Sequence, residues 1–250
     1  MGFLDRLLNR RRTGYIKGEG GRIEIYQYGN EKVMKFNGTV YSRLNPDVIY
    51  THEYWDCFIP LAYIYPKPRV LLIGLGGGTV AYQLKKLLGS SILIDAVDID
   101  KNMVGAMKGF LPEEIDIHVM IGDGAGYVKS VKHRYDVIIL DAYVDDLVPG
   151  QFLTQEFVDN VYDALGPAGT FAVNYINSSN GQERLENYIS LLKKRFRVFE
   201  VAPNSFTSNV VVVCSKAFGR EDILTRIASG IKADDANKHI VSAYENMKDA

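Results

Sequence analysis

Five short apolar runs constrain the fold of this chain more than any other feature of its sequence. The runs lie at 69–74, 91–100, 115–123, 135–143 and 169–176. Helical stretches separate them, at 79–88, 101–109, 124–132 and 154–165. Strands that are buried on both faces have this continuous apolar character, and their alternation with helices indicates right-handed crossovers between parallel strands. We therefore predict an open, mostly parallel α/β sheet.

Two further apolar runs near the end of the chain, 196–202 and 209–216, are joined by only six residues. Parallel neighbours need a much longer crossover, so these runs are predicted to form an antiparallel hairpin. An open parallel sheet that ends in such a hairpin is typical of the Rossmann-like class I methyltransferase fold. The predicted fold class is therefore α/β of this type.

The segment 14–51 has a different pattern, in which apolar and polar residues alternate with period two. Gly29-Asn30 and Asn37-Gly38 are turn signals within it. Alternation of this kind, interrupted by such turns, predicts a small antiparallel meander of three strands.

A helical pattern follows the meander, from 46 to 61. Prolines then interrupt the chain before the first apolar run. We place a loose boundary near residue 65, between an N-terminal β-domain with its linking helix (1–65) and a nucleotide-binding α/β domain (66–250).

The formal charge of the chain is nearly balanced, with 29 basic and 30 acidic side chains and a net charge of -1. This balance does not support a global basic surface for nucleic acid. No uninterrupted apolar run reaches the length of a membrane span, and the first residues lack the apolar segment and cleavage site of a signal peptide. We therefore expect a cytoplasmic protein with no nucleic-acid or membrane partner.

The two cysteines, Cys57 and Cys214, form no Cys-x-x-Cys pair and no Cys/His spacing typical of metal sites. We expect no bound metal. Two buried, unreactive thiols are the favoured interpretation of the cysteines, and a disulfide between them is the open alternative.

The strongest local motif is a glycine-rich turn that follows the first apolar run and opens a helix. Gly74, Gly76 and Gly78 lie in it, just before Thr79. Glycines here allow a ligand to approach the backbone closely, and the helix N-terminus faces that ligand. The motif also fits a dinucleotide fingerprint, and a tight turn without any ligand is the open alternative.

Acidic residues end the next two predicted strands. Asp98 is placed to accept hydrogen bonds from the hydroxyls of a ribose. Asp123, followed by Gly124, lies where an adenine amino group would be. A glycine turn and two successive acids favour an S-adenosyl nucleotide over NAD, although Asp123 could equally serve as a helix N-cap.

The fourth strand ends at Asp141, close to where the transferable group of a bound nucleotide would lie. A carboxylate there can orient an attacking amine or accept its proton. Tyr143 and Asp145 follow it and are further catalytic candidates, and a solvated acidic turn is the alternative for Asp145 and its neighbour. His52 and Glu53 could face the same cleft or form a surface pair.

Taken together, the sequence resembles the spermidine synthase (polyamine aminopropyltransferase) family. The matching segments include FNGTVYS, YTHEYWDCFIPLA, VLLIGLGGGTV, VDID, GDGAGYV, YDVIILDAY and PGQFLTQEF, in this order. The resemblance implies decarboxylated S-adenosylmethionine as co-substrate, a small-molecule amine acceptor, and a homodimer or homotetramer. It assigns the nucleotide to Gly74, Gly76, Gly78, Asp98, Asp123 and Gly124, catalysis to Asp141, and amine binding to the segment around Tyr41, His52 and Glu53.

The chain departs from the pattern of that family at three positions. Gly77 replaces an acid of the glycine turn, Val144 replaces a second acid of the catalytic loop, and Tyr41 replaces a glutamine. Each change removes a polar contact to an amine, and charge-assisted contacts of this kind contribute about 1.5–3 kcal/mol. The sequence resembles a divergent branch of the superfamily.

These observations favour aminopropyl transfer from decarboxylated S-adenosylmethionine to an amine. The alternatives are a methyltransferase that uses intact S-adenosylmethionine, favoured by Gly77 and Val144, and a nucleotide-binding protein without catalysis. An NAD oxidoreductase ranks last, because Asp123 and the terminal hairpin have no purpose there.

Overall fold

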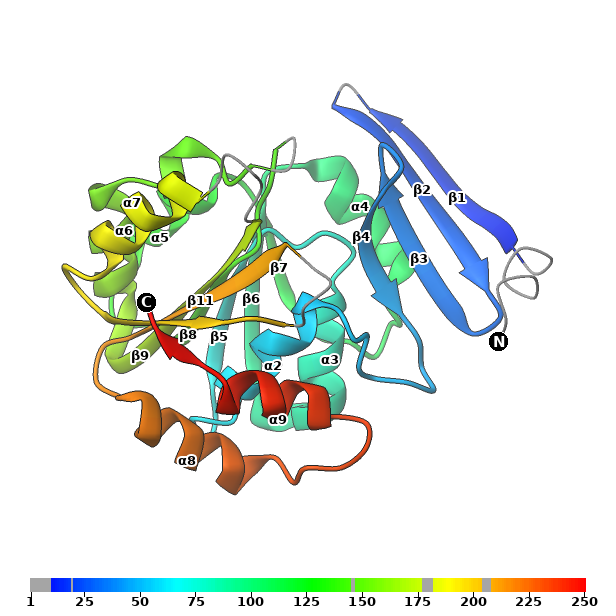
Figure 1. Cartoon of the computed structure of the whole chain (residues 1–250). Helices are drawn as coiled ribbons and strands as arrows, with labels where there is room; N and C mark the ends of the chain where they lie inside the picture. Colours follow the sequence, from blue (N-terminus) through cyan, green and yellow to red (C-terminus); the bar gives the residue numbers. More distant parts are fainter. Residues whose placement is uncertain (1–9, 19, 145–146, 177–181, 204–207) are drawn as a thin grey trace.

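Two sheets organise the chain in the computed structural model, which describes residues 10–18, 20–144, 147–176, 182–203 and 208–250 (Figure 1). The described N-terminal residues form a four-stranded antiparallel sheet in sequence order. Its strands are β1 (Arg10–Gly18), β2 (Gly21–Tyr28), β3 (Glu31–Phe36) and β4 (Thr39–Leu44).

The meander was predicted with three strands, and β1 is the strand that this prediction missed. Its sequence, RRRTGYIKG, is mostly polar, and its register against β2 shifts between Arg12 and Gly14. A strand at the edge of a sheet does not have to be buried on both faces. A polar sequence can therefore form such a strand through backbone pairing alone.

The larger sheet confirms the predicted fold class. Its order among the described residues is β12-β10-β11-β9-β8-β5-β6-β7. Five strands run parallel to one another: β5 (Arg69–Ile73), β6 (Leu93–Asp98), β7 (His118–Ile121), β8 (Tyr135–Leu140) and β9 (Leu165–Ile176). On its other side, β9 pairs antiparallel with β11. The antiparallel hairpin was also predicted correctly, and it consists of β10 (Arg197–Val201) and β11 (Asn209–Ser215). A short β12 (Lys248–Asp249) pairs with β10 at the edge.

Helices cover both faces of this sheet (Figure 1). On one face lie α5 (Gly124–Ser130), α6 (Gln155–Ala164) and α7 (Gln182–Leu192), which share an apolar cluster with β8 and β9. On the other face lie α3 (Thr79–Leu88), α4 (Lys101–Phe110), α8 (Arg220–Gly230) and α9 (Lys238–Glu245). Because the central strands β5 and β8 are covered on both sides, their apolar runs are continuous.

The small sheet packs on the α3–α4 side of the large sheet. Ile23, Met34 and Leu44 belong to the same apolar cluster as the residues of those helices. At the start of α3, the hydroxyl of Thr79 accepts a hydrogen bond from the backbone N–H of Arg43 at 3.0 Å and donates one to its carbonyl at 3.0 Å. The last strand of the small sheet is thereby fixed beside the glycine-rich turn. The domain boundary near residue 65 stays a prediction.

The helix predicted over 46–61 is wrong in its first half. Only a 3-10 turn (Tyr54–Phe58) and the short α2 (Ile59–Ala62) are helical. The buried carboxylate of Asp56 accepts hydrogen bonds from the backbone N–H groups of Thr51 and His52, at 3.0 and 2.7 Å, and these bonds hold 51–56 as a turn. A side chain that binds its own upstream backbone competes with helix formation.

Cys57 and Cys214 are buried and unpaired with each other, as the favoured interpretation predicted. Burial raises the pKa of the Cys57 thiol to about 12, which keeps it protonated and unreactive at neutral pH. Among the described residues, none of the helices combines the length and the apolar composition that crossing a bilayer requires.

Candidate active site

The glycine-rich turn is held in a conformation that glycine alone adopts without strain. Gly74 follows β5 with a φ of 83°, and its backbone N–H donates to the carbonyl of Val97 at 2.9 Å. A Cβ atom at this position would overlap the backbone carbonyl of Asp141. Gly76 and Gly78 also have positive φ, of 54° and 86°. The predicted turn therefore brings the ends of β5, β6 and β8 into contact.

Asp98 ends β6 beside this turn. Its carboxylate accepts a hydrogen bond from the backbone N–H of Leu75 at 2.8 Å and another from Asp100 at 2.9 Å. Burial raises the pKa of Asp98, and the backbone N–H groups oppose that rise. A carboxylate has about four acceptor positions, so these two bonds leave capacity for a ribose hydroxyl.

Asp123 ends the next strand and caps α5. It accepts hydrogen bonds from the backbone N–H groups of Ala125 and Gly126, at 3.3 and 2.9 Å, and from the side-chain amide of Gln151 at 2.7 Å. The capping interpretation is thus correct for this residue. Gly124 is required by packing, because a Cβ atom there would overlap Ile73 of β5. The adenine contact of Asp123 and Gly124 stays a prediction.

Two exposed isoleucines at the same edge were not identified from the sequence. Ile99 is 74% exposed and Ile121 is 60% exposed, although both are large apolar residues. Ile99 follows Asp98 directly, and Ile121 pairs with Asp98 across β6 and β7. Exposed apolar side chains beside carboxylate acceptors fit a ligand that has a flat base and a hydroxylated sugar. The residues present therefore suit an adenine nucleoside.

Asp141 lies partly buried at the end of β8, where the sequence predicted the catalytic carboxylate. Its Oδ1 accepts a hydrogen bond from the side-chain amide of Asn174 at 3.0 Å. Its Oδ2 accepts one from the hydroxyl of Tyr54 at 3.2 Å. Burial raises the pKa of Asp141 to about 6, although these bonds partly oppose the rise. A carboxyl group with a near-neutral pKa suits proton transfer.

A second layer of polar side chains supports Asp141, and the sequence analysis missed it. Asn174 is 1% exposed, and its side-chain oxygen accepts a hydrogen bond from the amide of Asn209 at 2.8 Å. Asn174 lies near the end of β9 within an otherwise apolar run, GTFAVNYI. One polar residue at a buried strand end was the signal that could have identified it.

The other residues predicted for the catalytic loop differ in what they contact. Tyr143 donates its hydroxyl hydrogen to the backbone carbonyl of Asn174, and its ring packs against the apolar cluster beneath α6 and α7. Its position supports the loop, and a catalytic role stays a prediction. Asp145 and Asp146 lie outside the described residues.

The predicted amine-binding residues lie around the segment that joins the two sheets. The ring of Tyr41 packs against Phe36, with centroids 5.3 Å apart. Glu53 lies 3.8 Å from the guanidinium of Arg43. His52 does not lie on a helix as expected: its φ is 59°, and its exposed ring stacks on His239 with centroids 4.2 Å apart. Their roles in binding an amine stay predictions.

Packing against the small sheet accounts for one departure from the family pattern. The backbone N–H of Gly77 donates to the hydroxyl of Ser42 at 2.6 Å. A Cβ atom at Gly77 would lie 2.7 Å from the Cβ of Ser42 and 3.1 Å from the ring of Phe110. An acidic side chain at this position therefore has no room. Val144, at the other departure, is 62% exposed.

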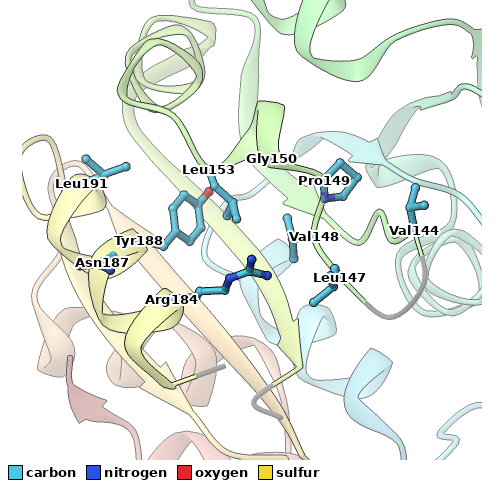
Figure 2. Close-up of a pocket in the computed structure, with 10 residues that line it drawn as sticks. All are labelled: Val144, Leu147, Val148, Pro149, Gly150, Leu153, Arg184, Asn187, Tyr188 and Leu191. Carbon is cyan, nitrogen blue, oxygen red and sulfur yellow. The ribbon is translucent and has the colours of Figure 1, made fainter. Parts of the chain in front are cut away.

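A cavity of about 470 Å³ lies between α7 and the loop that follows Asp141 (Figure 2). Loop residues 144, 147–150 and 153 form one wall, and α7 forms the other. Among the described residues, no group of three or more His, Cys, Asp or Glu side chains is arranged to hold a metal ion.

Comparison with known sequences identifies the family to which this chain belongs. The sequence model of the spermine/spermidine synthase domain matches residues 58–213. A probable polyamine aminopropyl transferase of Bifidobacterium longum is 34% identical over 120 residues, which are 48% of this chain and 27% of that protein. A polyamine aminopropyltransferase of Chromobacterium violaceum is 29% identical over 214 residues, which are 82% of this chain and 78% of that protein. The chain thus spans 27% of one relative and 78% of the other.

Solved structures share the fold. A probable spermidine synthase from Corynebacterium glutamicum matches with a TM-score of 0.73 and 18% identity, covering 92% of this chain and 94% of that one. A spermidine synthase in complex with the transition-state analogue AdoDATO matches with a TM-score of 0.67 and 21% identity, covering 94% and 85%. At these identities the likeness shows that the fold is shared.

Proposed function

Because this chain belongs to the spermine/spermidine synthase family, we propose that it transfers an aminopropyl group from decarboxylated S-adenosylmethionine to a small-molecule amine, in polyamine biosynthesis. The observation that carries the proposal is the environment of Asp141. Burial raises the pKa of its carboxyl group to about 6, and Tyr54 and Asn174 hold the carboxylate by hydrogen bonds. It lies at the same edge of the sheet as the glycine-rich turn.

In this reaction a neutral amine attacks the carbon next to the sulfonium of the donor. A C–N bond forms, the C–S bond breaks, and methylthioadenosine leaves. The proton of the attacking nitrogen passes to the carboxylate of Asp141, which also orients the amine. The two hydrogen bonds to Asp141 fix the direction in which its oxygens point. Holding the amine and the donor in line lowers the activation barrier, because the two reactants no longer have to meet by diffusion.

The edge formed by the glycine turn, Asp98 and Asp123 would hold the donor, with Ile99 and Ile121 against its base. Ser42 occupies the space in which an acid at Gly77 would extend. The absence of an acid at Gly77, together with Val144 in the catalytic loop, is what favours intact S-adenosylmethionine and hence a methyltransferase, because carboxylates that would repel the carboxylate of the intact donor are absent.

Calorimetric titration separates these functions. The protein is titrated with decarboxylated S-adenosylmethionine, intact S-adenosylmethionine, methylthioadenosine and NAD, and transfer to amines is then assayed with the wild type and Asp141→Asn. We expect preference for the decarboxylated donor and loss of turnover in the variant. Preference for the intact donor with methyl transfer would replace the proposal by the methyltransferase, and nucleotide binding without turnover would leave a non-catalytic protein.

We also propose that the protein is a cytoplasmic homodimer or homotetramer. Within the described residues, β1 ends the small sheet and offers backbone N–H and C=O groups for pairing. Light scattering coupled to size exclusion would measure the mass, and a monomer at micromolar concentration would contradict this assembly.

A further inference from the structure

Two amide side chains meet next to the proposed catalytic carboxylate. Asn174 of β9 is 1% exposed, and β11 pairs with β9 as its antiparallel neighbour (Figure 1). Val211 is the register partner of Asn174, and Asn209 stands two residues before Val211. Alternate residues of a strand share a face of the sheet, so the side chains of Asn174 and Asn209 point to the same side. Their amides are in contact there, with Nδ2 of Asn209 2.8 Å from Oδ1 of Asn174.

The surroundings of Asn174 on this face are apolar. Ala172 precedes it by two residues, Val211 lies opposite, and both are fully buried. A polar atom of Asn174 that lost its partner here would have no water to replace it, which costs more than a hydrogen bond contributes on average. Both ends of the Asn174 amide therefore need a partner. The nitrogen has Asp141 and the oxygen has Asn209.

The two ends of this set of contacts determine which groups donate and which accept. A carboxylate accepts hydrogen bonds and cannot donate them, so ionised Asp141 requires the NH2 group of Asn174. The carbonyl oxygen of Asn174 then points the other way, and it needs a donor. Asn209 supplies that donor. If the amide of Asn174 turned over, its oxygen would face Asp141 and would stabilise the neutral acid in place of the carboxylate.

We propose that Asn209 is a positioning residue, which fixes the amide of Asn174 in the orientation that keeps Asp141 ionised and able to accept the proton of the amine. The inference rests on the proposed aminopropyl transfer, because it assigns how the base of that reaction is held in its reactive form. Asn209 is the first residue of β11. The antiparallel hairpin thus contributes a side chain to a site that is otherwise built at the ends of parallel strands.

The other groups around Asp141 leave its protonation to this arrangement. Burial raises the pKa of Asp141 to about 6, and the side chains that oppose the rise are Asn174, Tyr54 and Trp55. Within the described part of the chain, Tyr54 is therefore the titratable group that acts on Asp141, and Tyr143 lies beside Tyr54. Burial raises the pKa of Tyr54 well above its usual value, so its hydroxyl stays protonated while Asp141 titrates.

Asn209→Asp tests the orientation directly. The new carboxylate cannot donate, so the NH2 group of Asn174 turns toward it and the oxygen of Asn174 faces Asp141. We expect the pKa of Asp141 to rise by about one to two pH units, the effect of one hydrogen bond to a charged group. Asn209→Leu removes the donor without adding charge. It should raise the pKa by less, because ionised Asp141 alone still favours the wild-type orientation of the amide.

The added charge of Asn209→Asp also acts on Asp141 directly, and the Asn174→Ala background separates the two effects. Without the amide of Asn174, Asn209→Asp acts through its charge alone. We expect its shift of the pKa of Asp141 to fall to about half or less in this background. Equal shifts in both backgrounds would overturn the inference. Asn246→Asp adds the same charge at the exposed end of α9 and leaves the pKa of Asp141 unchanged.

The pKa is measured in two ways, so that failure of this inference is distinct from failure of the proposed function. NMR of the carboxyl carbons follows the titration without any turnover, and the signal of Asp141 is the one missing from Asp141→Asn. The acidic limb of kcat, for transfer from decarboxylated S-adenosylmethionine to putrescine, should move by the same amount, with the KM of the donor unchanged. A shifted NMR titration supports the role of Asn209 even if no amine is turned over.

Turnover of putrescine with an unshifted titration in both Asn209 variants would leave the proposed function standing and overturn the role of Asn209. Circular dichroism checks that each variant is folded. If Asn209→Asp does not fold, Asn209→Leu decides the question. Its shift should be present in the wild-type background and absent in the Asn174→Ala background, and any other pattern would contradict the inference.

Discussion

The side-chain amide of Asn174 donates a hydrogen bond to Oδ1 of Asp141 at 3.0 Å. The two residues lie at the carboxyl ends of neighbouring parallel strands, Asn174 near the end of β9 and Asp141 just after β8, and are 33 positions apart in the sequence. The bond stabilises the charged carboxylate in a setting where burial favours the neutral acid. Asn174 is therefore a positioning residue that also adjusts the protonation of Asp141.

Asn174→Ala tests this relationship through the pH dependence of turnover. Loss of the hydrogen bond raises the pKa of Asp141 further, so the acidic limb of the kcat profile moves to higher pH. Tyr54→Phe removes the bond to Oδ2 and should move the limb in the same direction. Asn246→Ala, at the end of α9, is the control and leaves the limb in place. A pH profile of kcat that is lower at every pH, with its acidic limb in place, would show that Asn174 acts on stability alone.

Asp141→Asn should abolish transfer while the protein stays folded. In the wild type, kcat falls as the pH drops through about 6, because Asp141 becomes protonated and can no longer accept a proton. Circular dichroism and donor binding check that the variant is intact. Turnover near the wild-type level at pH 8 would exclude Asp141 as the proton acceptor.

The raised pKa of Asp141 also affects stability. The carboxyl of Asp141 has its ordinary pKa of 3.8 in the unfolded chain, and burial raises that pKa to about 6 in the folded protein. Between those values the folded state binds more protons, so this group contributes stability at low pH that is lost as the pH rises to about 6. The loss is at most about 3 kcal/mol. Urea unfolding at pH 4.5 and 7.0 should show a smaller difference in free energy for Asp141→Asn than for the wild type.

A second buried carboxylate joins the C-terminal helix to the turn before the catalytic site. His239 of α9 lies with Nε2 2.9 Å from Oδ2 of Asp56, which is 0% exposed. Burial favours the neutral acid, but hydrogen bonds from His239, Thr51 and Gln83 hold the pKa of Asp56 below its usual value. This carboxylate therefore contributes stability at neutral pH that is lost as the pH falls through its lowered pKa.

His239→Ala should lower the free energy of unfolding at pH 7 by about 1.5–3 kcal/mol, because a buried charged group loses a hydrogen bond. His118→Ala is the matched control, since that ring is 65% exposed beside Asp95 and an exposed pair contributes about 0–1 kcal/mol. Equal losses in the two variants, measured by urea unfolding, would contradict a structural role for the Asp56–His239 contact.

The contact between Gly77 and Ser42 gives a prediction about packing. Gly77→Ala places a Cβ atom 2.7 Å from that of Ser42, so it should destabilise the fold by about 1–3 kcal/mol. Ser42→Gly in the same chain should recover part of the loss. Gly122→Ala, at a position with open space, is the control. Thermal unfolding measures the stability of Gly77→Ala, of the double variant with Ser42→Gly, and of Gly122→Ala. An unchanged midpoint for Gly77→Ala would mean that β4 shifts to accommodate the added methyl group at little cost.

Local sequence patterns predicted most of the fold. Continuous apolar runs predicted β5 to β9 and the β10–β11 hairpin, because strands covered on both faces need apolar side chains at every position. The pattern failed at β1, whose edge position tolerates polar residues, and at 46–53, where the side chain of Asp56 binds the backbone in place of a helix.

The sequence also predicted part of the site, through the residue types at the strand ends. Gly74, Asp98, Asp123 and Asp141 lie at one edge of the sheet, since parallel strands share their carboxyl ends. It could not separate the capping role of Asp123 from an adenine contact, because the same carboxylate geometry serves both.

Side-chain period and turn residues within a few positions are enough to predict the succession of strands and helices along the chain and the chemistry at the strand ends. Which distant groups meet depends instead on tertiary packing. Asn174 holds Asp141, and His239 reaches Asp56 across 183 positions. Arg184 faces the loop after Asp141. Contacts of this kind follow from how the helices and strands pack, and packing is a property of the whole chain that no local pattern encodes.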